Sequence, residues 1–360
     1  MQSLNDFDMF PTTYDSIVER INNINPIKYA KTRNFINGDV TYLSPYLSRG
    51  VISVQQIKEA VLQKGFKPYE IEKFLQELAW REYYQRVWQV KKELIFSDLK
   101  QPQPDFLHTQ IPTAVIGAAT GIETIDAHIN TFYKTGYLHN HIRMYLASMV
   151  CNNAKAHWLA PATWMYYHLL DGDLASNSCS WQWVAASFSS KKYYCNQENI
   201  NKYTSSNQRH TFLDDSYEHI ATMPVPEALE TTISLAFVTN LPQTAVPKLD
   251  TSKPTLLYNS YNLDPLWRAN EPVNRVLILE PSHFNKYPVS DKVISFIIDL
   301  SKNISGIEIY VGEVDALVSQ YKNTDLTISN AFISKEHPAF EYYPGIKDSR
   351  DWMFPTTQGY

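Results

Sequence analysis

Apolar residues recur at intervals of three and four positions through much of the first 220 residues, which is the spacing of amphipathic helices. The clearest runs predict helices over residues 71–90, 125–133 and 139–150. The alternation of apolar and polar residues that marks strands is scarce in this part of the chain. We therefore predict an all-α domain over residues 1–220.

Residues 221–254 have a different composition and contain five prolines. Each proline lacks a backbone N–H donor and restricts the residue before it. This stretch is predicted to be a Pro-rich linker.

Short β-branched runs separated by helical patterns follow the linker. They predict strands over 255–258, 276–279, 307–311 and 326–329, with helices over 291–303 and from about Asp315. This alternation predicts a small α/β domain over residues 255–360, Rossmann-like with a mostly parallel sheet. Because it contains neither GxGxxG nor a Walker loop, nucleotide binding has no support there, and a docking or stabilising role is the favoured interpretation.

Composition narrows the class of protein. With 360 residues, 44% hydrophobic and 19% charged, the chain can fill a core, unlike an intrinsically disordered protein. Cys151, Cys179 and Cys195 form no CxxC pair, which argues against a disulfide framework or a zinc site. We expect no metal, no signal peptide and no membrane span, and hence a cytoplasmic protein.

Charge and aromatic content direct attention to the first 210 residues. The net charge of -5 is unevenly distributed, because this part is more basic than the remainder. Six of the eight tryptophans also precede residue 184. Residues 1–210 therefore suit a polyanionic partner, and a function that uses flat aromatic rings, better than the remainder of the chain does. Charge alone is equally consistent with a solvated surface that has no partner.

Two predicted helices each carry polar and large apolar groups on one face. Glu77, Trp80 and Arg81 lie at i, i+3 and i+4. Asn140, Arg143 and Met144 have the same spacing. The two faces are candidates for lining one cavity, while an amphipathic surface helix with an i,i+4 pair explains the first motif as well.

The segment DGDLASNSCSWQW, residues 171–183, is the strongest candidate for chemistry. Two carboxylates flank a glycine, and Asn177 and two tryptophans follow. Such groups are costly to bury unless partners or ligands satisfy them. At 100° per residue Trp181 and Trp183 point about 200° apart, so that one can face an interior cofactor and the other a flat substrate. Packing of both rings into a core is the alternative.

Four ordered motifs resemble the FAD-binding helical domain of the DNA photolyase/cryptochrome family. They are TYLSPYLSRGVIS (41–53), ELAWREYY (77–84), the segment 120–149 and LLDGDLASNSCSWQW (169–183), and the resemblance covers about residues 29–200. It implies FAD as cofactor, with a second, antenna chromophore of unknown identity left open.

The resemblance also implies roles for individual residues. The cofactor-binding set is Tyr29, Thr41, Leu43, Ser44, Arg81, Arg143, Asp171, Gly172, Asp173 and Asn177. Arg143 would pair with Asp171 near the flavin. Hydroxyls and backbone N–H groups would hold the FAD phosphates, from Tyr29, Thr41, Leu43 and Ser44. Asn177 would stabilise reduced flavin, whose redox chemistry the protein tunes.

By the same resemblance, the substrate is DNA that contains cyclobutane pyrimidine dimers. The substrate-binding set is Glu77, Trp80, Arg81, Asn140, Met144 and Trp183. Glu77 would stabilise the radical anion of the damaged bases, and the two tryptophans would form aromatic walls. Met144 stands where (6-4) photolyases typically have histidine, which favours the dimer lesion. The catalytic set is Glu77, Asn177, Trp181 and Trp158, the last two as members of an electron relay.

Departures from the family pattern bear on mechanism and domain order. The relay lacks a third tryptophan near Asp105 and Phe106, and Cys179 replaces a common glycine. The antenna-like α/β domain, which usually comes first, would here be displaced to the C-terminus. We predict a monomeric DNA-repair lyase; a cryptochrome-like light sensor without repair activity and a redox flavoprotein remain as alternatives.

Overall fold

The computed structural model describes residues 9–321 and 331–354, which form two compact units. Unit 1 comprises residues 1–24, 41–82 and 237–360, and unit 2 comprises residues 25–40 and 83–236. Each unit is thus built from separate stretches, whereas the sequence predicted one continuous domain before residue 220. The predicted domain boundaries remain a prediction.

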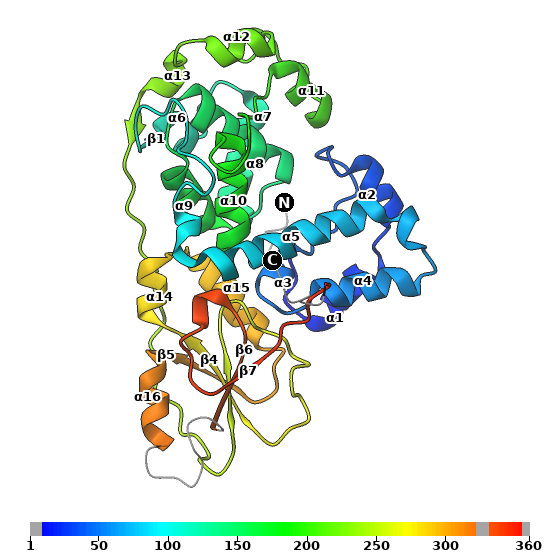
Figure 1. The fold of residues 1–360 in the computed structure, drawn as a ribbon, viewed down its shortest axis with the longest axis vertical. Coiled ribbons are helices and arrows are strands. Elements are labelled where there is room, and N and C mark those ends of the chain that lie inside the picture. Colours follow the sequence, from blue (N-terminus) through cyan, green and yellow to red (C-terminus); the bar gives the residue numbers. More distant parts are fainter. Residues whose placement is uncertain (1–8, 322–330, 355–360) are drawn as a thin grey trace, which may run out of the picture. The chain divides into compact units, whose positions relative to one another are not determined.

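Unit 2 consists of helices and one short ribbon (Figure 1). Its elements are α2 (Pro26–Thr32), α6 (Thr113–Ile116), α7 (Glu123–Thr135), α8 (Asn140–Ala147), α9 (Leu159–His168), α10 (Leu174–Ala185), α11 (Gln197–Thr204), α12 (Tyr217–Thr222), α13 (Glu227–Glu230), β1 (Ile111–Pro112) and β2 (Thr232–Ile233). Helix α5 (Glu72–Lys91) confirms the predicted 71–90 helix, and its residues from Tyr83 on belong to this unit.

The ribbon pairs β1 with β2 in antiparallel fashion, so the part before residue 237 is not purely helical. Helix α8 continues into a π-helical turn, Ser148–Asn153, all of whose residues are buried. Helices α12 and α13 together with β2 lie at or within the predicted linker, and the irregular stretch begins only after Ile233. Pro226 explains part of the difference, because it stands at the N-cap of α13, where proline is tolerated.

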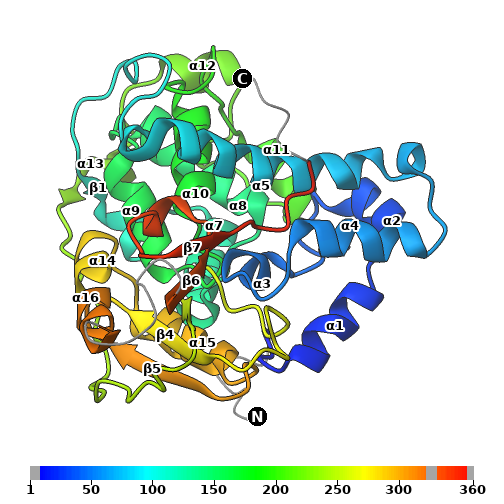
Figure 2. The same ribbon diagram turned by 60° about the horizontal axis from the view of Figure 1, so that its bottom comes forward.

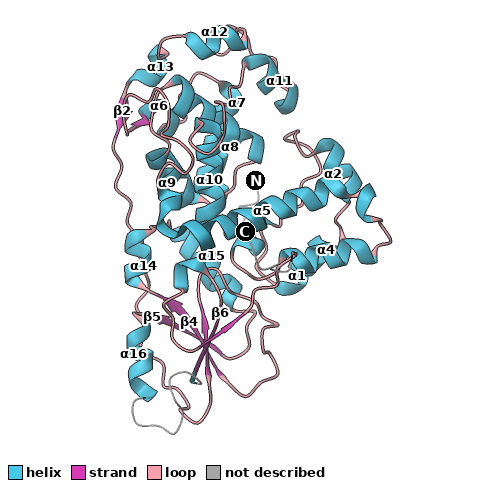
Figure 3. Cartoon of the chain, viewed as in Figure 1, coloured by secondary structure: helices cyan, strands magenta, loops and turns pink. Residues whose placement is uncertain are grey.

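Unit 1 contains a five-stranded sheet in addition to helices (Figure 3). The strands are β3 (Thr255–Tyr258), β4 (Asn274–Leu279), β5 (Ile307–Val311), β6 (Phe332–Lys335) and β7 (Ile346–Asp348). Its helices are α1 (Tyr14–Asn22), α3 (Ser44–Ser48), α4 (Val54–Gln63), the first part of α5, α14 (Pro281–Lys286), α15 (Asp291–Ser301) and α16 (Val314–Val318). The predicted strand at 326–329 lies outside the described residues.

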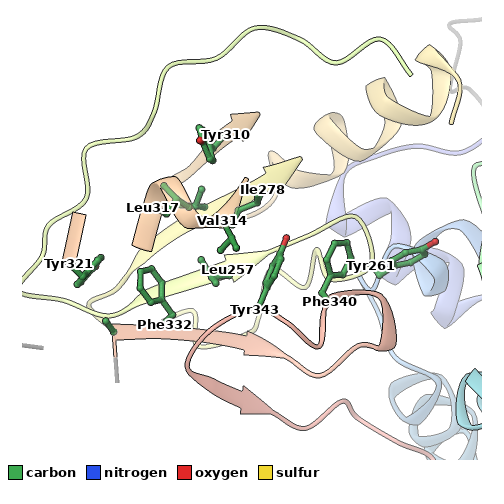
Figure 4. Close-up of a cluster of buried hydrophobic side chains, with 12 residues drawn as sticks. Leu257, Tyr261, Ile278, Tyr310, Val314, Leu317, Tyr321, Phe332, Phe340 and Tyr343 are labelled. Atoms are coloured by element: carbon green, nitrogen blue, oxygen red, sulfur yellow. The ribbon is translucent and has the colours of Figure 1, made fainter. Parts of the chain in front are cut away.

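All pairings in this sheet are parallel, which confirms the predicted parallel sheet. The strand order is β5-β4-β3-β6-β7, so the order reverses between β3 and β6 (Figure 2). Leu257 and Ile278 on one face join Val314 and Leu317 of α16 in a buried cluster (Figure 4). Leu256 points to the opposite face and is fully buried as well. Burial on both faces explains the near-continuous apolar runs of these strands.

Candidate functional site

The loop between α9 and α10 carries the two predicted carboxylates of unit 2. Asp171 and Asp173 are both buried. Gly172 separates them, and a Cβ there would lie 3.0 Å from the Leu169 carbonyl oxygen and 3.2 Å from the Tyr166 ring. A larger residue would therefore have to displace one of these neighbours. Close packing thus explains the glycine between the two acids.

Arg143 and Asp171 form the ion pair that the resemblance implied. Arg143 Nη2 donates to Asp171 Oδ1 at 3.0 Å and to Oδ2 at 2.8 Å. Its Nε donates to the Leu138 carbonyl at 2.9 Å, and its guanidinium lies 5.6 Å from the Tyr137 ring centre. The Asp171 side chain is only 5% exposed. The arginine therefore places a positive charge directly against a buried carboxylate.

Asp173 begins helix α10. Its Oδ1 accepts a hydrogen bond from the Ser176 N–H at 2.7 Å, which is the usual N-cap contact. Its Oδ2 accepts from the Gln85 side-chain amide. Sequence reasoning missed Gln85, although it lies four residues after Arg81 and so follows the same stripe of α5. Both carboxylate oxygens are therefore fixed by described residues.

Asn177, Ser176 and Cys179 complete the first turns of α10. Asn177 Nδ2 donates to the Ala162 carbonyl at 2.9 Å. Burial raises the pKa of the Cys179 thiol to about 12, with a smaller contribution from the Asp173 carboxylate. The thiol is thus neutral at pH 7 and adds no second anion beside Asp173. The Ser176 hydroxyl is buried and has no hydrogen-bond partner among the described residues.

The tryptophans of α10 take opposite surroundings, as the helical spacing predicted. Trp181 is 2% exposed and Trp183 is 44% exposed. The Trp183 ring lies 6.0 Å from that of Tyr193. Trp158 is fully buried, and its Nε1 donates to Asp98 Oδ1 at 2.7 Å. One indole of α10 is thus available on the surface of unit 2, and the other packs inside it.

Asn140 and Met144 lie one turn apart on α8. Asn140 is exposed, and its Nδ2 lies 3.7 Å from Met144 Sδ. Tyr29 is half-buried on α2. The roles of these three residues as pocket and cofactor groups stay predictions.

The remaining predicted residues lie in unit 1. On α5, Lys73 Nζ lies 3.6 Å from Glu77 Oε1, Trp80 is 48% exposed, and Arg81 Nη2 donates to Ser48 Oγ at 2.8 Å. The pair with Lys73 is the i,i+4 contact of a surface helix. Arg81 thus ties α5 to α3, a link that sequence reasoning missed.

Residues 41–44 lead into α3. Thr41 Oγ1 accepts from the Leu43 N–H at 3.4 Å, Leu43 is buried, and Ser44 is half-buried. Tyr42 between them has φ of 52°, which is uncommon for a residue with a side chain. The loop is therefore held in a specific backbone conformation.

The part of the chain that the structure describes has no group of three or more His, Cys, Asp or Glu arranged to hold a metal ion. It also has no helix long and apolar enough to cross a membrane.

Residues 74–227 match the family model of the FAD-binding domain of DNA photolyase. A deoxyribodipyrimidine photo-lyase of Synechococcus is 32% identical over 169 residues, or 44% of this chain and 35% of that protein. The enzyme of the same name from Streptomyces griseus is 30% identical over 160 residues, or 44% of this chain and 34% of that protein. A solved cryptochrome of Synechocystis is 23% identical, with a TM-score of 0.49 over 54% of this chain and 44% of that one.

These matches define a photolyase-type FAD-binding domain over residues 74–227. They confirm the resemblance to the photolyase/cryptochrome family. The match spans about a third of the length of the two curated relatives.

Proposed function

We propose that this protein is a light-dependent DNA-repair flavoprotein that splits cyclobutane pyrimidine dimers by electron transfer from reduced FAD. The observation that carries the proposal is helix α10. Its N-terminus is fixed by Asp173, one indole is buried inside unit 2, and the other is exposed. A helix arranged in this way can serve a cofactor on one side and a flat substrate on the other.

The residues of unit 2 fit a flavin nucleotide. The buried Ser176 hydroxyl has no hydrogen-bond partner within residues 9–321 and 331–354, and an unsatisfied buried polar group calls for a ligand or water. When bound, FAD supplies the electron. The protein supplies Asp171, held in place by Arg143, and Asp173 to accept hydrogen bonds, and Asn177 to tune the flavin. Tyr29, Thr41, Leu43, Ser44, Arg81 and Gly172 are the further cofactor residues in this proposal.

The substrate role rests on exposed rings beside polar groups. A lesion must leave the duplex to be processed, at a cost of a few kcal/mol that is lowest for a damaged base. Stacking of a base on an indole contributes about 1–3 kcal/mol. Trp183 and Trp80 are both nearly half exposed, so each has ring surface to offer. Asn140 and Glu77 are the proposed polar contacts to the damaged bases, and Met144 is the proposed apolar contact.

Several finer features belong to the same proposal. They are the helical domain followed by an α/β domain, a monomeric state, a cytoplasmic location and a second chromophore. The relay through Trp181 and Trp158 draws support from their burial, because a buried indole is shielded from water. The alternative is light sensing without repair, and the next experiment distinguishes the two functions.

The test compares binding to an oligonucleotide with one thymine dimer and to the same oligonucleotide without it. The full chain should prefer the lesion, and Trp183→Ala should reduce that preference about 5- to 150-fold, the value of one stacked base. Tyr217→Ala is the matched control, because Tyr217 lies in the same unit and is also 44% exposed. Equal affinity of the unaltered protein for both oligonucleotides would contradict repair and favour a sensor.

A further inference from the structure

The loop assigned to the flavin phosphates, residues 41–44, is built into the unit that contains the sheet. Helix α3, whose first residue is Ser44 of this loop, is buried there through Tyr46. The Tyr46 ring lies 6.1 Å from Phe296 of α15 and 6.4 Å from Phe10. Its hydroxyl donates to the Pro11 carbonyl at 2.8 Å. The α/β part therefore supports this loop by packing.

Gly50, at the other end of α3, contacts the turn that follows strand β3. Its φ is +62°, and a Cβ there would lie 2.2 Å from the Tyr261 carbonyl oxygen. The Leu263 N–H donates to the Arg49 carbonyl at 3.0 Å. The Arg49 side chain is buried, with its guanidinium 5.7 Å from the Tyr261 ring centre. No other residue type fits at position 50 without displacing the turn.

The turn after β3 is held in place by a hydrogen bond and by ring contacts. The Asn259 side chain accepts from the Tyr261 N–H at 2.9 Å. Tyr261 stacks on His337, which follows β6, at 4.5 Å and 9° between the ring planes, and Phe340 lies nearby (Figure 4). In open α/β sheets, ligands bind outside the carboxyl ends of the strands where the strand order reverses. In this protein the rings just described and the Arg49–Gly50 backbone lie at the carboxyl ends of β3 and β6, where the strand order reverses.

A shift at Gly50 passes directly to the loop, because only the short α3 separates them. The Leu47 N–H donates to the Leu43 carbonyl at 3.0 Å, and the Val51 N–H donates to the Tyr46 carbonyl at 2.9 Å. These hydrogen bonds connect Leu43 at the end of the loop to Val51 beside Gly50.

We propose that Arg49, Gly50 and Tyr261 are positioning residues for the loop at 41–44, so that binding of the FAD phosphates depends on the α/β part of the chain. This inference rests on the proposed flavin function. On this proposal, the place where the strand order of the sheet reverses supports the cofactor loop of the same chain.

The experiment compares the affinity of the full chain for FAD and for riboflavin, which lacks the phosphates. Gly50→Ala should weaken FAD binding about tenfold or more, which is the value of one hydrogen bond to a charged oxygen, and leave riboflavin binding unchanged. Gly65→Ala is the matched control, because Gly65 also has positive φ, at +88°, but nothing lies within 4 Å of an added Cβ. Gly65→Ala therefore carries the same conformational cost of a Cβ at positive φ, but its Cβ does not clash with a neighbouring residue.

A second pair of variants covers the case in which Gly50→Ala does not fold. Tyr261→Leu should reduce FAD affinity selectively, and Tyr261→Phe should restore it because the ring remains under Arg49 and against His337. Equal loss of FAD and riboflavin affinity, or none in a folded variant, would overturn the positioning role. Failure of the unaltered protein to bind FAD would instead overturn the proposed function.

Discussion

Replacing Arg143 with alanine should destabilise unit 2 and lower flavin occupancy. The change removes the two hydrogen bonds that Arg143 donates to Asp171, a carboxylate whose side chain is 5% exposed. Removing one member of a buried pair costs roughly 3–5 kcal/mol. The Arg143 side chain is itself 24% exposed, and water can enter the space it leaves, so we expect a value near the lower end, about 3 kcal/mol.

The assay is urea unfolding of the full chain, followed by tryptophan fluorescence, together with flavin content from the 450 nm absorbance. Glu77→Ala is the control, because its pair with Lys73 is more exposed, at 32% and 46%, and such pairs contribute only about 0–1 kcal/mol. Asp171→Asn should offset part of the loss when added to Arg143→Ala, because the buried carboxylate charge at position 171 is then removed together with its arginine partner. Equal unfolding midpoints and flavin contents for Arg143→Ala and Glu77→Ala would refute this reasoning.

Three further predictions concern electron transfer, acid stability and catalysis. Trp158→Phe or Trp181→Phe should keep flavin bound but slow its photoreduction, measured by bleaching at 450 nm; an unchanged rate would exclude these indoles from the relay. Burial lowers the pKa of His168 from 6.5 to about 4, so between these pH values the unfolded chain takes up a proton that the folded chain does not. Stability should therefore fall as the pH is lowered through this window, and His168→Phe should remove up to about 3 kcal/mol of that fall in acid unfolding; an identical pH profile in the variant would refute it. Glu77→Gln should leave lesion affinity nearly unchanged but lower the yield of dimer splitting per absorbed photon, because in the proposed function the carboxyl group acts on the radical anion; an unchanged yield would remove this role.

Local pattern was sufficient for features that depend on periodicity. The apolar spacing of residues 71–90 predicted α5, and the 100° turn per residue predicted that one tryptophan of α10 is buried and the other exposed. Family resemblance added the pairing of Arg143 with Asp171. Patterns of β-branched residues predicted the parallel sheet.

Contacts between distant stretches had no signal in the sequence. Gln85 bonds to Asp173, 88 positions further along the chain, and neither residue type specifies the other. Arg49 and Gly50 meet the turn at Tyr261 through tertiary packing alone. Strand β7 was missed because it spans only three residues, two of them exposed, too few to show a period. Such long-range contacts determine which separate stretches of the chain belong to each unit.

Light-dependent repair tests the central claim most directly. The full chain with its flavin chemically reduced is mixed with an oligonucleotide that contains one thymine dimer, and intact thymines are counted after illumination at near-UV or blue wavelengths and after an equal time in the dark. We predict restoration in the light, over many dimers per protein, and none in the dark. If the fully reduced, flavin-loaded protein restores no dimers in the light, the repair function is contradicted, and a flavin-binding light sensor becomes the better account.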